Sequence, residues 1–367
     1  MPHAEVHVFE RGTKALAKVA VTGGGRCNLT NTFAEVSDLQ QVYPRGDKLM
    51  RRMLGMFSQH DAMRWFEQAG VKLTIQADQC VFPQSQNAME IVHTLLRLME
   101  RSGVHLHLSA VVTPQSLEGF DRIVVTTGSF PRHGTPEFLL PYHLDIKPPI
   151  PSLFTFNIPT VNKSLMGIVV NNVSCSLAGA KFRASGPLLL THWGMSGPAI
   201  LRLSSYAARH LAESGYQAVL VVNWCGEQSE EEVRTSLLTL LSMNAHKTIG
   251  NAWLNHLTQR HWQELLNRAS VPLTQRCEAL NKTLFNRLLS VLTADHYPIT
   301  GKGAFKEEFV TCGGVSLSNI SSKTLESKNH PGLYFAGEVL DVDGVTGGFN
   351  LQAAWSMGYV VAQSISE

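Results

Sequence analysis

The sequence has little charge and no long apolar run. Asp, Glu, Lys and Arg make up 16% of the 367 residues, against roughly 25% in an average soluble chain, which argues against a disordered or coiled-coil scaffold. No stretch of about 18 uncharged apolar residues occurs, so we expect no transmembrane helix and no membrane partner. The opening residues, MPHAEVHVFERG, have neither a basic nor an apolar segment and predict no signal peptide.

The cysteines are not paired. Six occur, at Cys27, Cys80, Cys175, Cys225, Cys277 and Cys312, and none forms a CxxC or a zinc-finger spacing. Single thiols scattered through a large chain predict a reduced, cytoplasmic protein, and they do not indicate a redox disulfide. The formal charge of +2 gives no general reason to expect a polyanionic partner.

The chain also lacks a dinucleotide-binding fingerprint. Residues 5–10 (EVHVFE) predict a strand that ends on an acid, Glu10, as the second strand of a nucleotide-binding unit does. Such a unit begins with another strand, a G-x-G-x-x-G turn and a helix, and none of these is in the sequence. Either the gene model starts late or the chain is a truncated form. We expect FAD to bind this chain weakly, because the pyrophosphate loses the helix N-terminus that would hold it.

A glycine-rich segment is the first positive signal. Residues 22–31 read TGGGRCNLTN. Three consecutive glycines permit positive φ and leave backbone N–H groups uncovered, and Arg26 adds a planar cation. The segment suits contact with a phosphate or a flat polar ring, and the alternative is a flexible loop.

Hydrophobic periodicity predicts an α/β chain. We expect helices over 47–70 and 87–101, and strands over 104–108 and 121–128. The pair His105 and His107 could bind a metal, but the sequence offers no third ligand. We interpret it as an exposed strand face and assign no metal site.

Prolines crowd residues 131–159 and indicate a crossover between domains. Short strands are then expected over 153–158, 167–177, 180–183, 187–191 and 217–224, which is typical of a small barrel or sandwich. Helices are expected over 229–241, 252–269 and 273–293, followed by a strand-like run at 308–310.

The C-terminal segment carries the strongest signal. A short apolar strand at 332–336 precedes GEVLDVDGVTGGFNLQAAWSMG, and we expect a helix from about Asn350 to Ser364. A strand, an acidic loop, a Gly-Gly turn and a helix predict a ligand-binding crevice at the carboxyl edge of a sheet.

In these motifs the chain resembles the BaiN/YhiN-like family of FAD-dependent NAD(P)/FAD oxidoreductases. The resemblance covers essentially the whole chain and also includes TCGGVSL (311–317) and THWGMSGPAIL (191–201). It implies a glutathione-reductase-type, Rossmann-like FAD domain interrupted by a β-barrel-like insert and a helical subdomain. The implied boundaries are an FAD domain over 1–148 and 312–367, a β-rich insert over 149–228 with a return strand at 299–311, and a helical subdomain over 229–298.

The resemblance also implies cofactor-binding roles, but no catalytic residue. Glu10 would bind the adenosine ribose, Val112 would contact adenine through its backbone, and Gly128 would end the strand beside the dinucleotide. The loop beside the pyrophosphate and isoalloxazine would comprise Thr22, Gly23, Gly24, Gly25, Arg26 and Asn28. Gly337 and Glu338 would lie at the ribityl chain. The flavin-facing loop and helix start would comprise Asp341, Gly347, Gly348, Phe349, Asn350 and Leu351.

Three functions remain open. The first is a flavoprotein that transfers hydride between NAD(P)H and a small unsaturated molecule, reducing a conjugated C=C bond. The second is an RNA-modifying flavin reductase that acts on a uridine of ribosomal RNA. The third is a truncated remnant that binds no cofactor.

Overall fold

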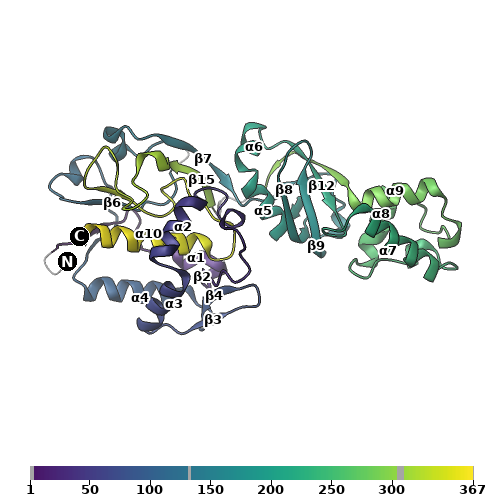
Figure 1. Ribbon diagram of the computed structural model, residues 1–367, viewed down its shortest axis with the longest axis horizontal. Coiled ribbons are helices and arrows are strands. Elements are labelled where there is room, and N and C mark those ends of the chain that lie inside the picture. The colour runs from purple at the N-terminus through teal and green to yellow at the C-terminus, as the bar shows by residue number, and fades with distance from the viewer. Residues whose placement is uncertain (1–3, 131–133, 304–309, 367) are drawn as a thin grey trace. The chain divides into compact units, whose positions relative to one another are not determined.

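The computed structural model describes residues 4–130, 134–303 and 310–366. The chain divides into two compact units (Figure 1): unit 1 comprises residues 1–150 and 310–367, and unit 2 comprises residues 151–309. Most of the strand-like run at 308–310 lies outside the described residues. Among the residues that are described, no helix combines the length and the apolar character needed to cross a membrane.

Unit 1 mixes short strands with helices. Its strands are β1 (His7–Phe9), β2 (Thr30–Asn31), β3 (Leu73–Ile75), β4 (Cys80–Pro83), β5 (His105–His107), β6 (Ile123–Val125), β15 (Val310–Val315) and β16 (Leu333–Phe335). Its helices are α1 (Ala17–Gly25), α2 (Asp47–Met56), α3 (Gln59–Gln68), α4 (Ala88–Arg101) and α10 (Phe349–Ser366). A further strand, β7 (Ile146–Ser152), pairs with β15.

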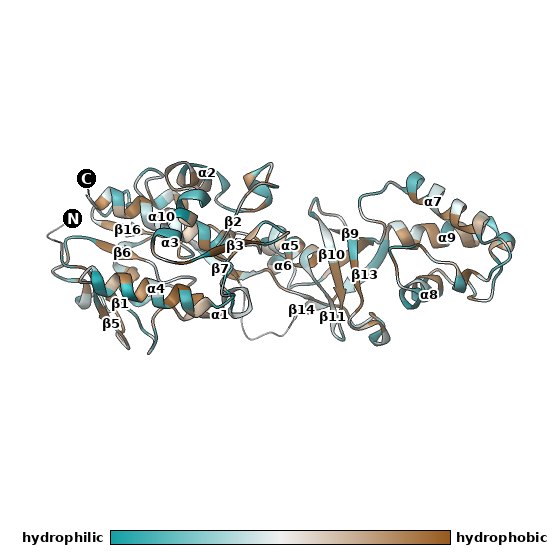
Figure 2. Ribbon diagram, turned by 90° about the horizontal axis from the view of Figure 1, so that it is seen from below, coloured by the Kyte–Doolittle hydropathy of each residue, from teal (hydrophilic) through white to brown (hydrophobic). Residues whose placement is uncertain are grey.

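Strands far apart in the chain pair in parallel in unit 1. β1 pairs with β5, and β6 pairs with β16; the second pair is apolar along its length (Figure 2). β2, β4 and β3 form a separate antiparallel sheet. Parallel pairs joined through helical segments are typical of a Rossmann-type domain.

The helices of unit 1 confirm one expectation and correct another. Residues 87–101 form α4 as predicted, and the Asn87 side chain accepts the N–H of Met89 to cap it. The single helix expected over 47–70 is two helices. The chain is extended at Phe57, and Ser58 and Asp61 form a capping box that begins α3, which fixes a new helix start there.

Unit 2 contains one seven-stranded sheet. Its strand order is β13-β12-β9-β10-β11-β8-β14, and its pairings are antiparallel. The strands are β8 (Phe156–Asn157), β9 (Val169–Leu177), β10 (Arg183–Leu190), β11 (Gly194–Ser196), β12 (Ala218–Asn223), β13 (Asp295–Ile299) and β14 (Gly301–Lys302). The two strands expected over 180–183 and 187–191 are the single strand β10, whose register shifts between Gly186 and Leu188.

The helices of unit 2 are α5 (Pro198–Tyr206), α6 (Ala208–Glu213), α7 (Glu230–Met243), α8 (Gln259–Arg268) and α9 (Lys282–Thr293). α8 and α9 are shorter than predicted. Thr258 and Asn281 each accept a backbone N–H with their side chains and begin these helices later, since a polar cap competes with helix continuation. Short 3-10 helices occur at Leu39–Gln41, Gln115–Leu117, Glu137–Tyr142, Lys163–Leu165, Ile249–Asn251, Cys277–Ala279 and Leu317–Asn319.

A buried carboxylate links the sheet of unit 2 to α8. Asp295 is 3% exposed and accepts the indole N–H of Trp224 over 3.1 Å. The Arg268 guanidinium donates to both of its oxygens, over 2.9 Å and 2.5 Å, and lies 4.1 Å from the ring centroid of Tyr297. The charge of Asp295 is therefore matched inside the protein.

We expect Arg268→Ala to destabilise unit 2 by about 3 kcal/mol or more, because the Asp295 carboxylate is left buried without its cation. Arg234→Ala is the matched control. Arg234 also pairs with a carboxylate, Glu230, and lies over an aromatic ring, but that pair is exposed and is worth less than about 1 kcal/mol. Urea unfolding followed by tryptophan fluorescence measures both, and equal losses would contradict the assignment.

Candidate functional site

The glycine-rich segment ends α1 in an open turn. The backbone φ is 57° at Gly23, 68° at Gly24 and 82° at Gly25, a left-handed run that other residues adopt only under strain. A Cβ atom added at Gly24 or Gly25 would meet no other atom within 4 Å. The backbone of these two residues therefore faces open space, where a ligand can reach it.

Arg26 is held beside this turn. Its Nε donates to the Gly23 carbonyl over 3.2 Å, and its guanidinium lies 4.6 Å from the ring centroid of Phe82. The side chain of Thr22 instead donates to the Val19 carbonyl of α1 over 2.8 Å. Arg26 is thus an exposed cation next to the open backbone, and its side chain contacts Gly23 and Phe82.

The glycine-rich segment contacts the start of α10 backbone to backbone. A Cβ atom at Gly348 would lie 2.4 Å from the carbonyl oxygen of Thr30. The Asn31 side-chain amide donates to the Gly347 carbonyl over 3.1 Å, and the Thr30 hydroxyl donates to Gln352 of α10 over 2.6 Å. Two motifs from opposite ends of the chain therefore lie in direct contact.

Further polar contacts join the same two motifs. With its amide nitrogen toward Thr30, the Asn28 side chain donates to that carbonyl over 3.0 Å and accepts the N–H of Gly348 over 3.2 Å. The Trp355 indole donates to the Leu29 carbonyl over 3.0 Å. Asn28 thus holds the turn before α10 in place.

The side chains at the start of α10 support the loop before it. The Asn350 amide both donates to and accepts from the backbone of Gly344, each over 2.8 Å. Phe349 is 5% exposed and packs edge-on against Phe33 and Tyr43, while Leu351 is partly buried against the core of unit 1. These three predicted side chains therefore make contacts within the protein.

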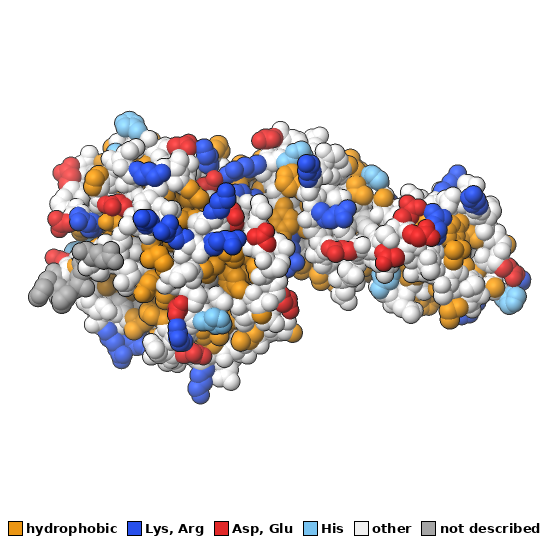
Figure 3. Space-filling model, viewed as in Figure 1, with side chains coloured by type: hydrophobic (Ala, Val, Ile, Leu, Met, Phe, Trp, Pro, Cys, Tyr) orange, Lys and Arg blue, Asp and Glu red, His pale blue; other side chains and the backbone are white. Residues whose placement is uncertain are grey.

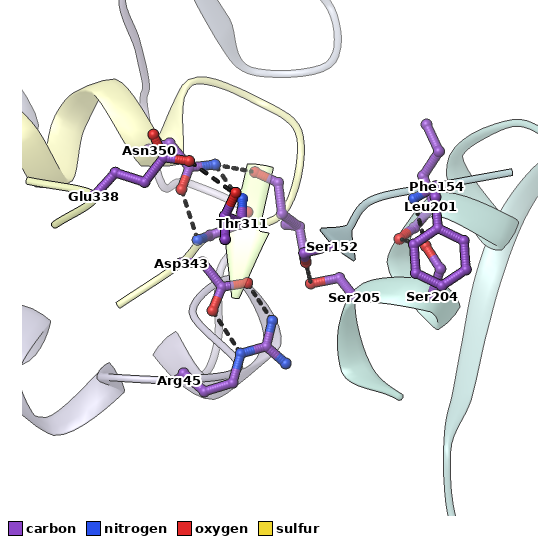
Figure 4. A network of polar contacts seen from close by, with 12 residues as sticks. Arg45, Ser152, Phe154, Leu201, Ser204, Ser205, Thr311, Glu338, Asp343 and Asn350 are labelled. Carbon is purple, nitrogen blue, oxygen red and sulfur yellow. Dashed lines mark hydrogen bonds and ion pairs between the residues drawn. The ribbon is translucent and has the colours of Figure 1, made fainter. Parts of the chain in front are cut away.

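A buried ion pair fixes the acidic loop. The Arg45 guanidinium donates to both oxygens of Asp343, one of them over 2.5 Å (Figure 4). The Asp343 side chain is fully buried and that of Arg45 is 11% exposed. Asp341, the acid that the sequence analysis selected, donates its backbone N–H to the Val315 carbonyl over 2.9 Å. No local pattern in the sequence indicates Asp343, because its partner Arg45 is almost 300 residues away.

Lys18, Gly128 and Glu338 meet at another part of unit 1. The Lys18 ammonium donates to a Glu338 oxygen over 2.5 Å, and the other Glu338 oxygen accepts the Thr311 N–H over 3.2 Å (Figure 4 shows the second contact). Gly128 has a φ of 73°, and a Cβ atom there would lie 3.3 Å from the Lys18 nitrogen. Adjacent Gly337 donates its N–H to the Met357 sulfur over 3.2 Å. Lys18, which no motif indicated, is thus a cation beside two of the predicted residues.

Glu10 and Val112 lie in the part of unit 1 around β1 and β5. Glu10 follows β1, and its carboxylate accepts the N–H of Gly12 over 2.5 Å. Val112 belongs to no strand, although the resemblance implied a strand backbone at that position.

Cys27 lies in the turn as a buried thiol. Burial raises the pKa of Cys27 to about 11, although a hydrogen bond with Thr22 works in the opposite direction. The thiol is therefore protonated at neutral pH and is a poor nucleophile.

Comparison with known proteins relates the whole chain to one family. The sequence model of the HI0933-like protein Rossmann domain matches residues 1–364. The chain is 29% identical to the ribosomal RNA dihydrouridine synthase of Escherichia coli (strain K12), over 98% of this chain and 92% of that protein. It is 27% identical to the protein of the same name from Haemophilus influenzae, over 98% and 92%. It is 24% identical to the 3-dehydro-bile acid delta(4,6)-reductase of Clostridium scindens, over 99% and 93%.

We expect Gly348→Ala to destabilise unit 1 far more than Gly70→Ala. Both glycines have a positive φ, 87° and 95°, but only Gly348 has an atom within 4 Å of the added Cβ. The shared backbone strain is about 1–2 kcal/mol, and the clash with Thr30 adds roughly 1–3 kcal/mol. Thermal unfolding of the two variants measures the difference, and equal melting temperatures would show that the two motifs do not touch as described.

Proposed function

Because the chain belongs to the HI0933-like Rossmann domain family, we propose that it is an FAD-dependent oxidoreductase that reduces a conjugated C=C bond with electrons from NAD(P)H. The observation that carries this proposal is the junction of the glycine-rich turn with the start of α10. That junction leaves the backbone of Gly24 and Gly25 open beside Arg26.

The residues of unit 1 fit the chemical parts of FAD. A pyrophosphate needs cations or backbone N–H groups, which Lys18, Arg26 and the open turn provide. The hydroxyl groups of a ribose or ribityl chain need acceptors, which the carboxylates of Glu10 and Glu338 provide. The first turn of α10 has N–H groups without an intrahelical partner and a partial positive charge.

We propose a role in cofactor binding for each of these residues. Glu10 would accept a ribose hydroxyl, Glu338 would accept from the ribityl chain, and Lys18 would offset the charge of the pyrophosphate. Gly347 and Gly348 would set the position of the first turn of α10 beside the cofactor, since a side chain at Gly348 would clash with Thr30. When bound, FAD supplies the hydride chemistry, and the protein supplies position and electrostatics.

The proposed architecture divides the chain into a cofactor domain and an inserted part. Unit 1 would be the glutathione-reductase-type FAD domain. Residues 149–228, which lie in unit 2 from residue 151 on, would be the β-barrel-like insert, and residues 229–298 of unit 2 would be the helical subdomain. The antiparallel sheet of unit 2 and its helices α7, α8 and α9 support this assignment.

Two substrate classes share the proposed chemistry. Reduction of uridine to dihydrouridine saturates a C=C bond conjugated to a carbonyl, and a 3-dehydro steroid with delta(4,6) double bonds carries the same kind of bond. Small unsaturated ketones are our first choice, and the two dihydrouridine synthases among the relatives favour ribosomal RNA as the second. On the face drawn in Figure 3, Lys and Arg side chains are spread over both units among acidic and apolar ones.

Anaerobic turnover separates the two substrate classes. The protein is incubated with FAD, reduced with NADH or NADPH, and mixed either with a 3-keto-4,6-diene steroid or with unmodified ribosomal RNA. Our first choice predicts that the steroid reoxidises the flavin rapidly and that RNA does not. Reoxidation by RNA with formation of dihydrouridine would favour the second choice. If neither NADH nor NADPH reduces the flavin in the presence of the protein, the proposed function is rejected.

We expect Glu10→Ala to weaken FAD binding about tenfold or more, because it removes a charge-assisted hydrogen bond worth roughly 1.5–3 kcal/mol. Glu67→Ala is the control, since Glu67 is an exposed acid on α3. Fluorescence titration with FAD gives both dissociation constants. An unchanged constant for Glu10→Ala would remove Glu10 from the site.

A further inference from the structure

Three histidines and a glutamate lie together on the β1–β5 strand pair. His7 of β1 stands opposite His105 of β5, and Phe9 stands opposite His107. Side chains two residues apart along a strand share one face, so Glu5, His7, His105 and His107 project from the same side. Strand pairing thus joins residues that are about a hundred positions apart.

The side chains converge at distances suited to one ion. The His7 Nε2 atom is 2.9 Å from a Glu5 carboxylate oxygen, and the His105 Nε2 atom is 3.7 Å from the same oxygen. One ligand atom from each of Glu5, His7 and His105 lies within 4.8 Å of the other two. Ligands about 2.1 Å from a tetrahedral Zn²⁺ are about 3.4 Å apart, so small side-chain movements close the site.

His107 contacts the ring nitrogen of His7 that does not face Glu5. The His7 Nδ1 atom is 2.9 Å from the His107 Nε2 atom, and the two rings are nearly parallel, with 2° between their planes and 5.2 Å between their centroids. Metal-binding histidines commonly donate their second ring N–H to an acceptor, which fixes the tautomer and the ring orientation. Here the Nδ1–H of His7 would donate to His107, leaving Nε2 of His7 as the ligand. This contact would fix the orientation of the His7 ring toward Glu5 and His105.

We propose that Glu5, His7 and His105 bind a divalent transition-metal ion of the Zn²⁺ class, with His107 orienting His7. Two imidazoles and one carboxylate suit Zn²⁺ and its neighbours, and a water molecule would complete a tetrahedron. Mg²⁺ and Ca²⁺ prefer sites made of oxygen ligands and are poorly matched.

The bound ion would cross-link β1 to β5. Because the site uses none of the residues proposed to bind FAD, its test does not depend on flavin binding. The side chains of Glu5 and His105 are 71% and 54% exposed and that of His7 is 22% exposed, so an ion can enter from solvent. The sequence analysis interpreted His105 and His107 as an exposed strand face. In the structure these two histidines lie beside His7 of β1 and near Glu5, which precedes β1.

The test is a competition titration of Zn²⁺ with a chromophoric chelator on the tag-free full chain. We expect one saturable Zn²⁺ site per chain, at least about tenfold weaker in His105→Ala and in Glu5→Gln. His246→Ala is the matched control, because His246 also lies 3.2 Å from a glutamate oxygen, of Glu278, and is exposed. Mg²⁺ should not compete.

A thermal melt gives a second reading of the same proposal. Zn²⁺ should raise the melting temperature of the wild type and of His246→Ala, because the ion binds only the folded strand pair. It should raise that of His105→Ala much less. The proposal is overturned if no saturable Zn²⁺ site is found, or if His105→Ala and Glu5→Gln bind Zn²⁺ as the control does.

Discussion

The candidate site in unit 1 depends on the close approach of Gly348 to the carbonyl of Thr30. No side chain fits between these two backbones, so the glycine-rich turn and the start of α10 have one relative position. The hydrogen bonds of Asn28, Asn31 and Thr30 across the same junction satisfy polar groups that the close approach buries. The open turn at Gly24 and Gly25 therefore has a fixed neighbour, as a pre-organised binding surface requires.

Buried polar pairs hold the loops that lead into this junction. Asp343 is enclosed and neutralised by Arg45, and Asn350 hydrogen-bonds both backbone groups of Gly344. A buried ion pair adds little net stability, yet removing one partner is costly because a buried charge remains. Such pairs favour one loop conformation over others, which suits a loop proposed to bind a cofactor.

The sequence predicted local features better than contacts between distant segments. The glycine-rich turn and α4 follow from composition and periodicity, and both are present. The helix expected over 47–70 was wrong because a capping box at Ser58 and Asp61 competes with continuation. Lys18 beside Glu338 and His7 beside His105 depend on chain pairings that no local pattern encodes. The roles given to Glu10, Val112 and the loop residues came from family resemblance, and they stay predictions.

Hydrogen–deuterium exchange of the full chain, with and without FAD, tests the central claim most directly. If the junction of the glycine-rich turn and α10 holds the cofactor, FAD will slow exchange in two separate peptides, one spanning residues 22–28 and the other spanning 337–351. Protection confined to unit 2, or protection of one of these peptides without the other, would contradict the account.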